Sequence, residues 1–152
     1  KVMQECIAIL KKFEIPFEVH ISSAHRTPER TREIVLTSEK RGAAVFIGAA
    51  GMAAHLAGAI AAHTLKPVIA VPLAGGVLDG LDALLSSVQM PQAVPVATMS
   101  VGKAGAINAA FFASQILSLL PQYPNLAQLL VKERKDRASQ LEKDTQSIQS
   151  EI

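Results

Sequence analysis

The sequence predicts a three-layer α/β sandwich built around a parallel sheet. Short apolar segments alternate with longer helical segments four times along the 152 residues. The apolar segments are hydrophobic at odd and even positions alike, which is typical of parallel strands covered by helices on both faces. The turns that follow them are rich in glycine, alanine and serine. A chain of this length has room for one hydrophobic core.

The elements follow one another in a regular order. A helix opens the chain, with apolar residues repeating from Val2 to Phe13 at helical spacing. We expect strands at 17–22, 43–48, 67–71 and 95–99. We expect the other helices at 28–42, 53–64, 78–90, 103–120 and 126–150. The opening helix has no N-cap or entering loop, so we expect a further strand before Lys1, a first strand that this chain lacks.

The helix at 28–42 has the clearest start signal. Thr27 is a suitable N-cap, Pro28 occupies the favoured first helical position, and Glu29 complements the helix dipole. These three residues place the end of the preceding turn at Thr27.

The last predicted helix differs from the others. Its apolar residues form one thin stripe on a polar rod: Val131, Ala138, Leu141 and Ile148. Such a helix could lie solvated on its own domain or pack as an arm on a neighbouring subunit. The stripe continues past what a compact domain needs, which favours the arm. We therefore expect a compact domain over residues 1–120 and, over residues 121–152, a helical arm that packs on a neighbouring subunit.

The composition argues against several classes of protein. With no tryptophan and one tyrosine, the chain lacks aromatic platforms for single-stranded nucleic acid. A formal charge of +2 gives no strong basic face for DNA or RNA. No apolar run reaches the roughly 20 residues of a membrane span, and the single Cys6 excludes an internal disulfide. We expect no nucleic-acid or membrane partner and a cytoplasmic location.

The turns after the four strands indicate where a ligand binds. They lie at 22–28, 48–55, 72–80 and 100–108. In open α/β sheets, ligands bind beyond the carboxyl ends of the strands. Small residues let backbone amides approach a ligand closely, and helix N-termini favour anions. Four such turns on one edge predict a crevice for a phosphorylated small molecule, although none matches a P-loop or a G-x-G-x-x-G fingerprint.

A few polar side chains in these turns are candidates for chemistry. Arg26, with Ser22 and Ser23, suits a phosphate, and the imidazole of His25 suits proton transfer near neutral pH. His55 is compatible with a catalytic role and equally with a structural one. The remaining titratable groups are interpreted as structural or are left open: His20, His63, Asp79, Asp82 and Lys103. The spacing of the histidines gives no convincing metal site.

Several segments together resemble one enzyme family. SAHRTP (23–28), AGMAAHLAG (50–58), GLDALLSSVQMP (80–91), PVATM (95–99) and GKAGAINAA (102–110) are similar to motifs of the N5-carboxyaminoimidazole ribonucleotide mutases of bacterial purine biosynthesis. The similarity runs in order from residue 2 to about residue 120. The resemblance implies a flavodoxin-like sandwich, a homo-octamer, and a C-terminal helix that reaches onto a neighbouring subunit.

The resemblance also implies a reaction and its residues. The family moves a carboxylate from the exocyclic N5 of an imidazole ribonucleotide to ring carbon C4, through CO2 held in the pocket and without a metal or an organic cofactor. His25 matches the histidine that shuttles the proton, and Ser23, Ala24 and Arg26 match the turn that holds the ribonucleotide. The loop lining the carboxylate pocket is matched by Ala50, Gly51, Met52, Ala53, His55 and Leu56.

The chain departs from the family pattern in two ways. The family usually reads AGGAAHLPG, whereas this chain has Met52 and Ala57. Family members also begin with a strand and a G-S-x-S-D turn, so we expect that residues 1–152 alone neither fold stably nor catalyse. Two alternatives stay open: an aminoimidazole ribonucleotide carboxylase that uses free CO2, and a non-catalytic nucleotide-binding paralogue.

Overall fold

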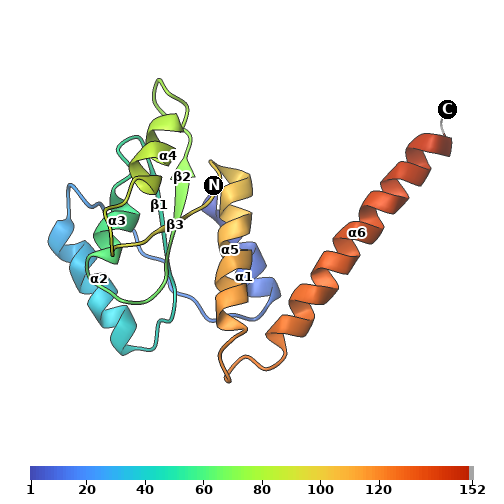
Figure 1. The fold of residues 1–152 in the computed structure, drawn as a ribbon, viewed down its shortest axis with the longest axis horizontal. Coiled ribbons are helices and arrows are strands. Elements are labelled where there is room, and N and C mark those ends of the chain that lie inside the picture. Colours follow the sequence, from blue (N-terminus) through green and yellow to red (C-terminus); the bar gives the residue numbers. More distant parts are fainter. Residues whose placement is uncertain (151–152) are drawn as a thin grey trace.

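The computed structural model describes residues 1–150 and confirms the α/β sandwich. Its sheet has three parallel strands in the order β1 (Phe46–Gly51), β2 (Val68–Leu73) and β3 (Ala97–Thr98) (Figure 1). Strand β2 is central, with Phe46 opposite Val68 on one side and Ile69 opposite Ala97 on the other. The carboxyl ends of all three strands therefore meet at one edge of the sheet.

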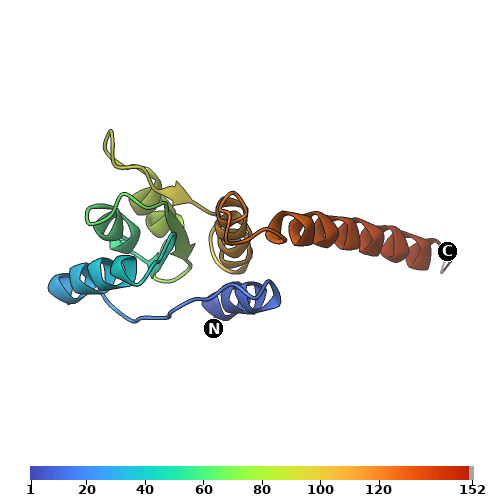
Figure 2. The same ribbon diagram turned by 90° about the horizontal axis from the view of Figure 1, so that it is seen from below.

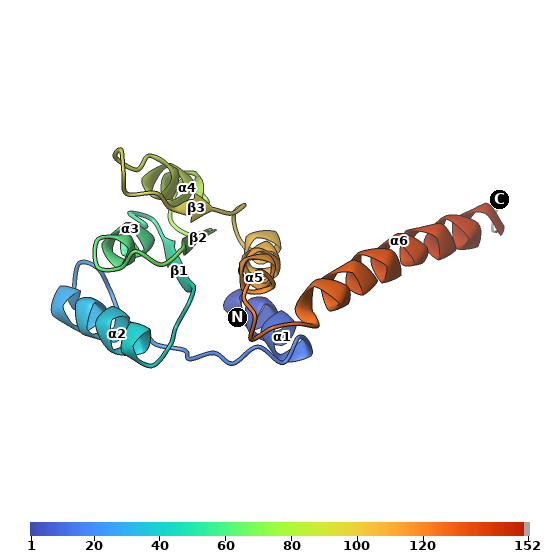
Figure 3. The ribbon, with the colours of Figure 1, turned by 60° about the horizontal axis from the view of Figure 1, so that its bottom comes forward.

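Helices cover both faces of this sheet. The helices α1 (Met3–Lys12) and α5 (Lys103–Leu117) pack together on one face. The helices α3 (Leu56–Ala61) and α4 (Leu81–Val88) lie on the other face, and α2 (Pro28–Lys40) packs against α3 (Figure 3). This arrangement gives the three layers that the alternation predicts.

The central strand divides the core into two halves. Ile69 and Val71 point into a cluster with α1 and α5, whereas Val68 and Ala70 point into a cluster with α2 and α3. Side chains alternate across a strand, so a run that is apolar at every position is buried on both faces. The prediction of a doubly covered strand at 67–71 is confirmed.

The prediction of a strand at 17–22 is wrong. This segment runs extended between α1 and α2, outside the sheet (Figure 2). Its apolar residues Phe17, Val19 and Ile21 are all exposed, and Ile21 is 88% exposed. A strand requires a hydrogen-bonded neighbour, and none of residues 1–150 pairs with this segment. Glu18 instead accepts hydrogen bonds from Arg41, at 2.8 Å from Nε and 2.6 Å from Nη2, and these hold the segment against the end of α2.

Several predicted boundaries also shift. Strand β1 begins at Phe46 and continues to Gly51. The sequence predicts a turn for its last small residues, but these residues pair in register with β2 as far as Leu73. Helix α3 consequently begins only at Leu56, after a short loop. Strand β3 is reduced to Ala97–Thr98.

The final helix α6 (Leu126–Ser150) projects away from the sandwich (Figures 1 and 2). Its base is anchored by Leu126 and by Glu133, which is buried and forms ion pairs with Lys12 of α1 and with Arg137. Beyond Glu133, residues 134–150 are all exposed, including Leu141 and Ile148 of the apolar stripe. Among residues 1–150, no helix combines the length and the apolar character needed to cross a membrane.

Candidate active site

Two histidines from different turns meet at the carboxyl edge of the sheet. Nε2 of His25 lies 2.8 Å from Nδ1 of His55, which is hydrogen-bonding distance. Their ring centroids are 4.9 Å apart and the ring planes are inclined at 77°. One ring must donate the shared proton while the other accepts it. The structure thus joins two candidate residues that are separated by 30 positions in the sequence.

The first turn places His25 through a compact hydrogen-bond network. The N–H of Ser23 donates to Oγ1 of Thr27 at 2.9 Å, and the N–H of Thr27 donates to the carbonyl of Ser23 at 3.0 Å. The hydroxyl oxygen of Ser23 accepts the N–H of Arg26 at 3.2 Å. Thr27 occupies the predicted N-cap position of α2, but its side chain closes this turn instead of capping the helix. The network leaves His25 and Arg26 exposed at the tip of the turn.

The second loop places His55 at the start of α3. Ala54 is buried, the N–H of His55 donates to the carbonyl of Ala53 at 2.8 Å, and the carbonyl of His55 accepts the N–H of Ala59. His55 therefore precedes the helix as its N-cap residue, although its side chain makes no cap hydrogen bond. Because its backbone is held on both sides, its imidazole can project from the edge of the sheet toward His25.

The other candidates of this loop divide into three groups. Ala50 and Gly51 are the last residues of β1, opposite Pro72 and Leu73 of β2. Leu56 packs against the core between α2 and α3. Met52 and Ala53 are exposed. In the first turn, Ala24 is half-buried beside His25.

The third and fourth turns contribute less to this cluster. Asp82 accepts the N–H of Ala83 within its own helix, at 2.9 Å, in line with a structural role. Lys103 forms an ion pair with Glu5 of α1, at 2.9 Å. His20 likewise pairs with Glu18 at 2.9 Å, as expected for a structural histidine. Arg26, which follows His25 in the chain, is exposed and has no ion-pair partner within residues 1–150.

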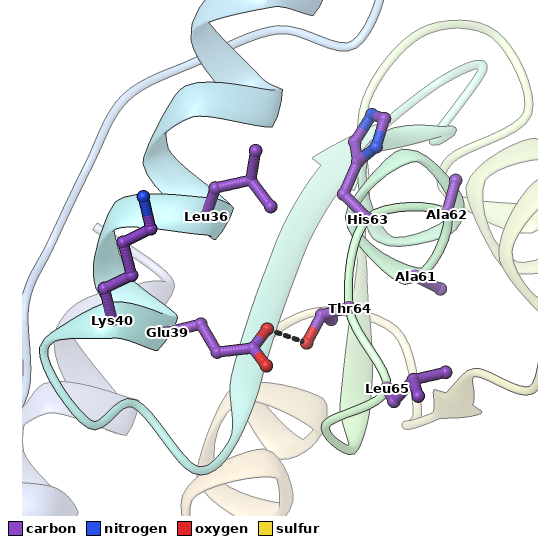
Figure 4. Close-up of a pocket in the computed structure, with 8 residues that line it drawn as sticks. All are labelled: Leu36, Glu39, Lys40, Ala61, Ala62, His63, Thr64 and Leu65. Carbon is purple, nitrogen blue, oxygen red and sulfur yellow. Dashed lines mark hydrogen bonds between the residues drawn. The ribbon is translucent and has the colours of Figure 1, made fainter.

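Two hollows of the surface lie away from the imidazole pair. One of about 570 Å³ lies between the end of α2 and the loop after α3, and its lining includes Lys40 and His63 (Figure 4). Across it, the hydroxyl of Thr64 donates to Glu39 at 2.6 Å. A second, of about 670 Å³, lies between α5 and the base of α6. Neither hollow is lined by His25 or His55, and both histidines are exposed in the single chain.

Comparison with known proteins identifies relatives along nearly the whole chain. An N5-carboxyaminoimidazole ribonucleotide mutase of Pyrococcus abyssi is 51% identical over 135 residues, which cover 89% of this chain and 75% of that protein. A protein of the same name from Bacillus subtilis is 47% identical over 136 residues, which cover 90% of this chain and 83% of that protein.

A solved structure extends the likeness to three dimensions. The crystal structure of Treponema denticola PurE matches with a TM-score of 0.79 at 25% identity, covering 94% of this chain and 87% of that chain. This match confirms the flavodoxin-like fold. The family model described as AIR carboxylase matches residues 1–140. With its motifs, its fold and its relatives in agreement, this chain belongs to the AIR carboxylase family.

Proposed function

We propose that this protein is an N5-carboxyaminoimidazole ribonucleotide mutase of purine biosynthesis, an isomerase that moves a carboxylate from N5 to C4 of its substrate. The observation that carries the proposal is the 2.8 Å contact between His25 and His55 at the carboxyl edge of the sheet. It occurs in a chain that is 51% identical to a protein named for this activity.

The imidazole pair supplies the proton movements of this reaction. Release of CO2 breaks the N5–carboxylate bond, and N5 then takes a proton from His25. The C4 carbon next forms a bond to the CO2, and its proton passes to His25. One proton is delivered and one is taken, so His25 ends as it began and no net acid or base is needed.

His55 acts by holding the second nitrogen of His25. Because Nε2 of His25 is engaged by His55, its Nδ1 is the nitrogen left for the substrate. When Nδ1 takes a proton, the ring becomes a cation whose Nε2–H donates to the neutral His55. The contact therefore stabilises the protonated form of His25, which donates to N5 at the start and is restored by the C4 proton at the end, and it keeps the ring in one orientation.

The neighbouring residues bind the rest of the substrate. The guanidinium of Arg26 is exposed without an ion-pair partner in residues 1–150, so it is available to the phosphate. The hydroxyl of Ser23 accepts one backbone N–H and still has its own O–H to donate. Ala24 lies between them. The segment from Ala50 to Ala53, continuing to Leu56, forms small-residue walls around the carboxylate and the CO2.

Assembly into a homo-octamer completes this site. In a single chain His25 and His55 are exposed, whereas a reaction that holds CO2 requires the exclusion of water. The apolar stripe of α6 and an exposed apolar face of α4, with Leu81, Leu85 and Val88, offer surface for neighbouring subunits. An enzyme of this pathway fits a cytoplasmic location, and the reaction requires no added cofactor.

An ultraviolet assay of the full-length enzyme tests the proposal. Wild-type protein should convert N5-carboxyaminoimidazole ribonucleotide to the C4-carboxylated isomer, and His25→Asn should lower kcat by about 10²–10⁴-fold. His63→Asn, at the far end of α3, is the matched control and should keep normal activity. Turnover only with aminoimidazole ribonucleotide and bicarbonate would assign the carboxylase activity instead. Nucleotide binding without either reaction would assign a non-catalytic paralogue.

A further inference from the structure

Met52 has an unusual backbone for a residue with a side chain. Its φ is 52°, in the left-handed region that glycine adopts most easily. It lies in the loop after β1, three positions before His55. Strain of this kind persists only where the surroundings enforce it, and it gathers at functional sites. Glycine would adopt this backbone conformation without strain, so the presence of a methionine side chain at this position needs an explanation.

The side chain of Met52 reaches a neighbouring loop. A Cβ atom placed on Gly76 would lie 3.4 Å from Cγ and 3.7 Å from Sδ of Met52. Apart from the chain neighbours of Gly76, no other atom of residues 1–150 comes within 4 Å of that position. The side chain of Met52 thus lies next to Gly76, at ordinary van der Waals distance from a methyl group placed there.

Gly76 belongs to the loop between β2 and α4. The loop leaves the sheet after Leu73, opposite Gly51, and returns at Gly80, which packs closely on Ala74 and Val101. Between these points, residues 74–79 are exposed, and Val77 at the tip is completely exposed. From the loop carrying His55, the side chain of Met52 lies beside the middle of this exposed loop.

We propose that Met52 is a positioning residue that holds the loop 74–80 beside the imidazole pair. A methionine suits this task because its unbranched, polarizable side chain can settle on an irregular surface. Its effect on catalysis depends on the mutase function proposed above. A loop held in place keeps CO2 near C4 until the new bond forms, whereas a displaced loop lets CO2 and aminoimidazole ribonucleotide escape.

Limited proteolysis tests the loop contact without reference to activity. Thermolysin cuts before exposed aliphatic residues, so it should cleave before Val77 or Leu78 several-fold faster in Met52→Ala than in wild type. Met52→Leu, which restores an apolar side chain, should return the rate close to wild type. Met90→Ala is the matched control, because Met90 lies at a similar distance from a Cβ placed on Gly58, outside this loop. Equal cleavage of wild type and Met52→Ala would overturn the proposal.

Product partitioning tests the catalytic consequence. In Met52→Ala, the fraction of turnovers that end as free aminoimidazole ribonucleotide should rise several-fold and kcat should fall, while KM changes little. Met52→Leu should reverse both effects, and Leu65→Ala, on the opposite edge of the fold, should cause neither. Faster proteolysis with unchanged partitioning would refute the positioning role. An inactive wild-type enzyme would refute the proposed function instead, while the proteolysis would still decide the loop contact.

Discussion

Replacing Gly105 with alanine should destabilise the fold far more than the same change at Gly58. Each glycine is the third residue of its helix, α5 or α3. A Cβ atom on Gly105 would lie 1.7 Å from the carbonyl oxygen of Ser100 and 2.8 Å from its carbon. Both are backbone atoms, so α5 must move away from the turn that precedes it. A Cβ on Gly58 would instead meet the flexible end of Met90, at 3.4 Å.

The two magnitudes follow from opposing effects. Overpacking of this kind costs about 1–3 kcal/mol, and more where backbone must shift. Alanine in place of glycine favours a helix by up to about 1 kcal/mol. We expect Gly105→Ala to lose about 2 kcal/mol or more, whereas Gly58→Ala should be neutral or gain up to about 1 kcal/mol.

Urea unfolding of the two variants in the full-length enzyme measures this difference. With a slope of about 2 kcal/mol per molar urea, the transition midpoint of Gly105→Ala should fall by about 1 M. The midpoint of Gly58→Ala should stay at or above that of wild type. The same midpoint for Gly105→Ala and wild type would show that the turn at Ser100 is not fixed, and the close-packing argument would then be refuted.

Three further predictions concern charges and assembly. Hydrogen bonding from Lys12 holds the pKa of Glu133 below its usual 4.5, so the stability it contributes is present above that pH and is lost as the pH falls toward the lowered pKa. The melting temperature of Glu133→Gln should therefore lie below that of wild type at pH 7, and the difference should shrink in acid. Arg26→Met should raise KM for the ribonucleotide at least about tenfold in steady-state assays, as expected for the loss of a charged hydrogen bond, while the melting temperature stays unchanged. Leu141→Glu should give smaller assemblies in analytical ultracentrifugation, whereas Glu142→Gln, next to it on the same helix, should not.

The sequence allows a correct account of the layers but not of every strand. The run from Val68 to Val71 is apolar at each position, and this local property predicts its burial on both faces. The alternation in residues 17–22 is equally clear, yet no strand within residues 1–150 pairs with this segment. Periodicity records which faces a strand would present, whereas pairing depends on a neighbour that may lie anywhere in the chain. Local patterns therefore predict elements more reliably than they predict partners.

Site prediction shows the same division between local and distant information. Motifs mark His25 and His55 separately, but nothing in the sequence states that their nitrogens lie 2.8 Å apart. Glu133 was missed altogether, because a carboxylate on a charged helix is usually solvated. Its burial depends on Lys12, 121 positions away. Only the three-dimensional packing of α6 on α5, which brings Glu133 to Lys12 of α1, makes this anchor visible.

The distance between the two imidazoles is set by helix packing more than by strand pairing. His25 precedes α2 and His55 precedes α3, and these helices pack through Val35 against Ala57 and Ile60. Helix α3 in turn lies so close to β1 that a Cβ atom on Gly48 would come within 3.0 Å of the Ala57 Cα.

The small residues Gly48 and Ala57 let α3 pack closely on β1, and this packing fixes the position of the His55 imidazole. A larger side chain at position 48 would lift α3 from the sheet and move His55, although Gly48 itself packs against α3 and not against the imidazole pair. Because one ring must stay within hydrogen-bonding distance of the other, the tolerance for such a shift is a few tenths of an ångström. The apolar packing beneath the site thus maintains the hydrogen bond between His25 and His55. This requirement for close packing explains the small residues of the β1–α3 segment.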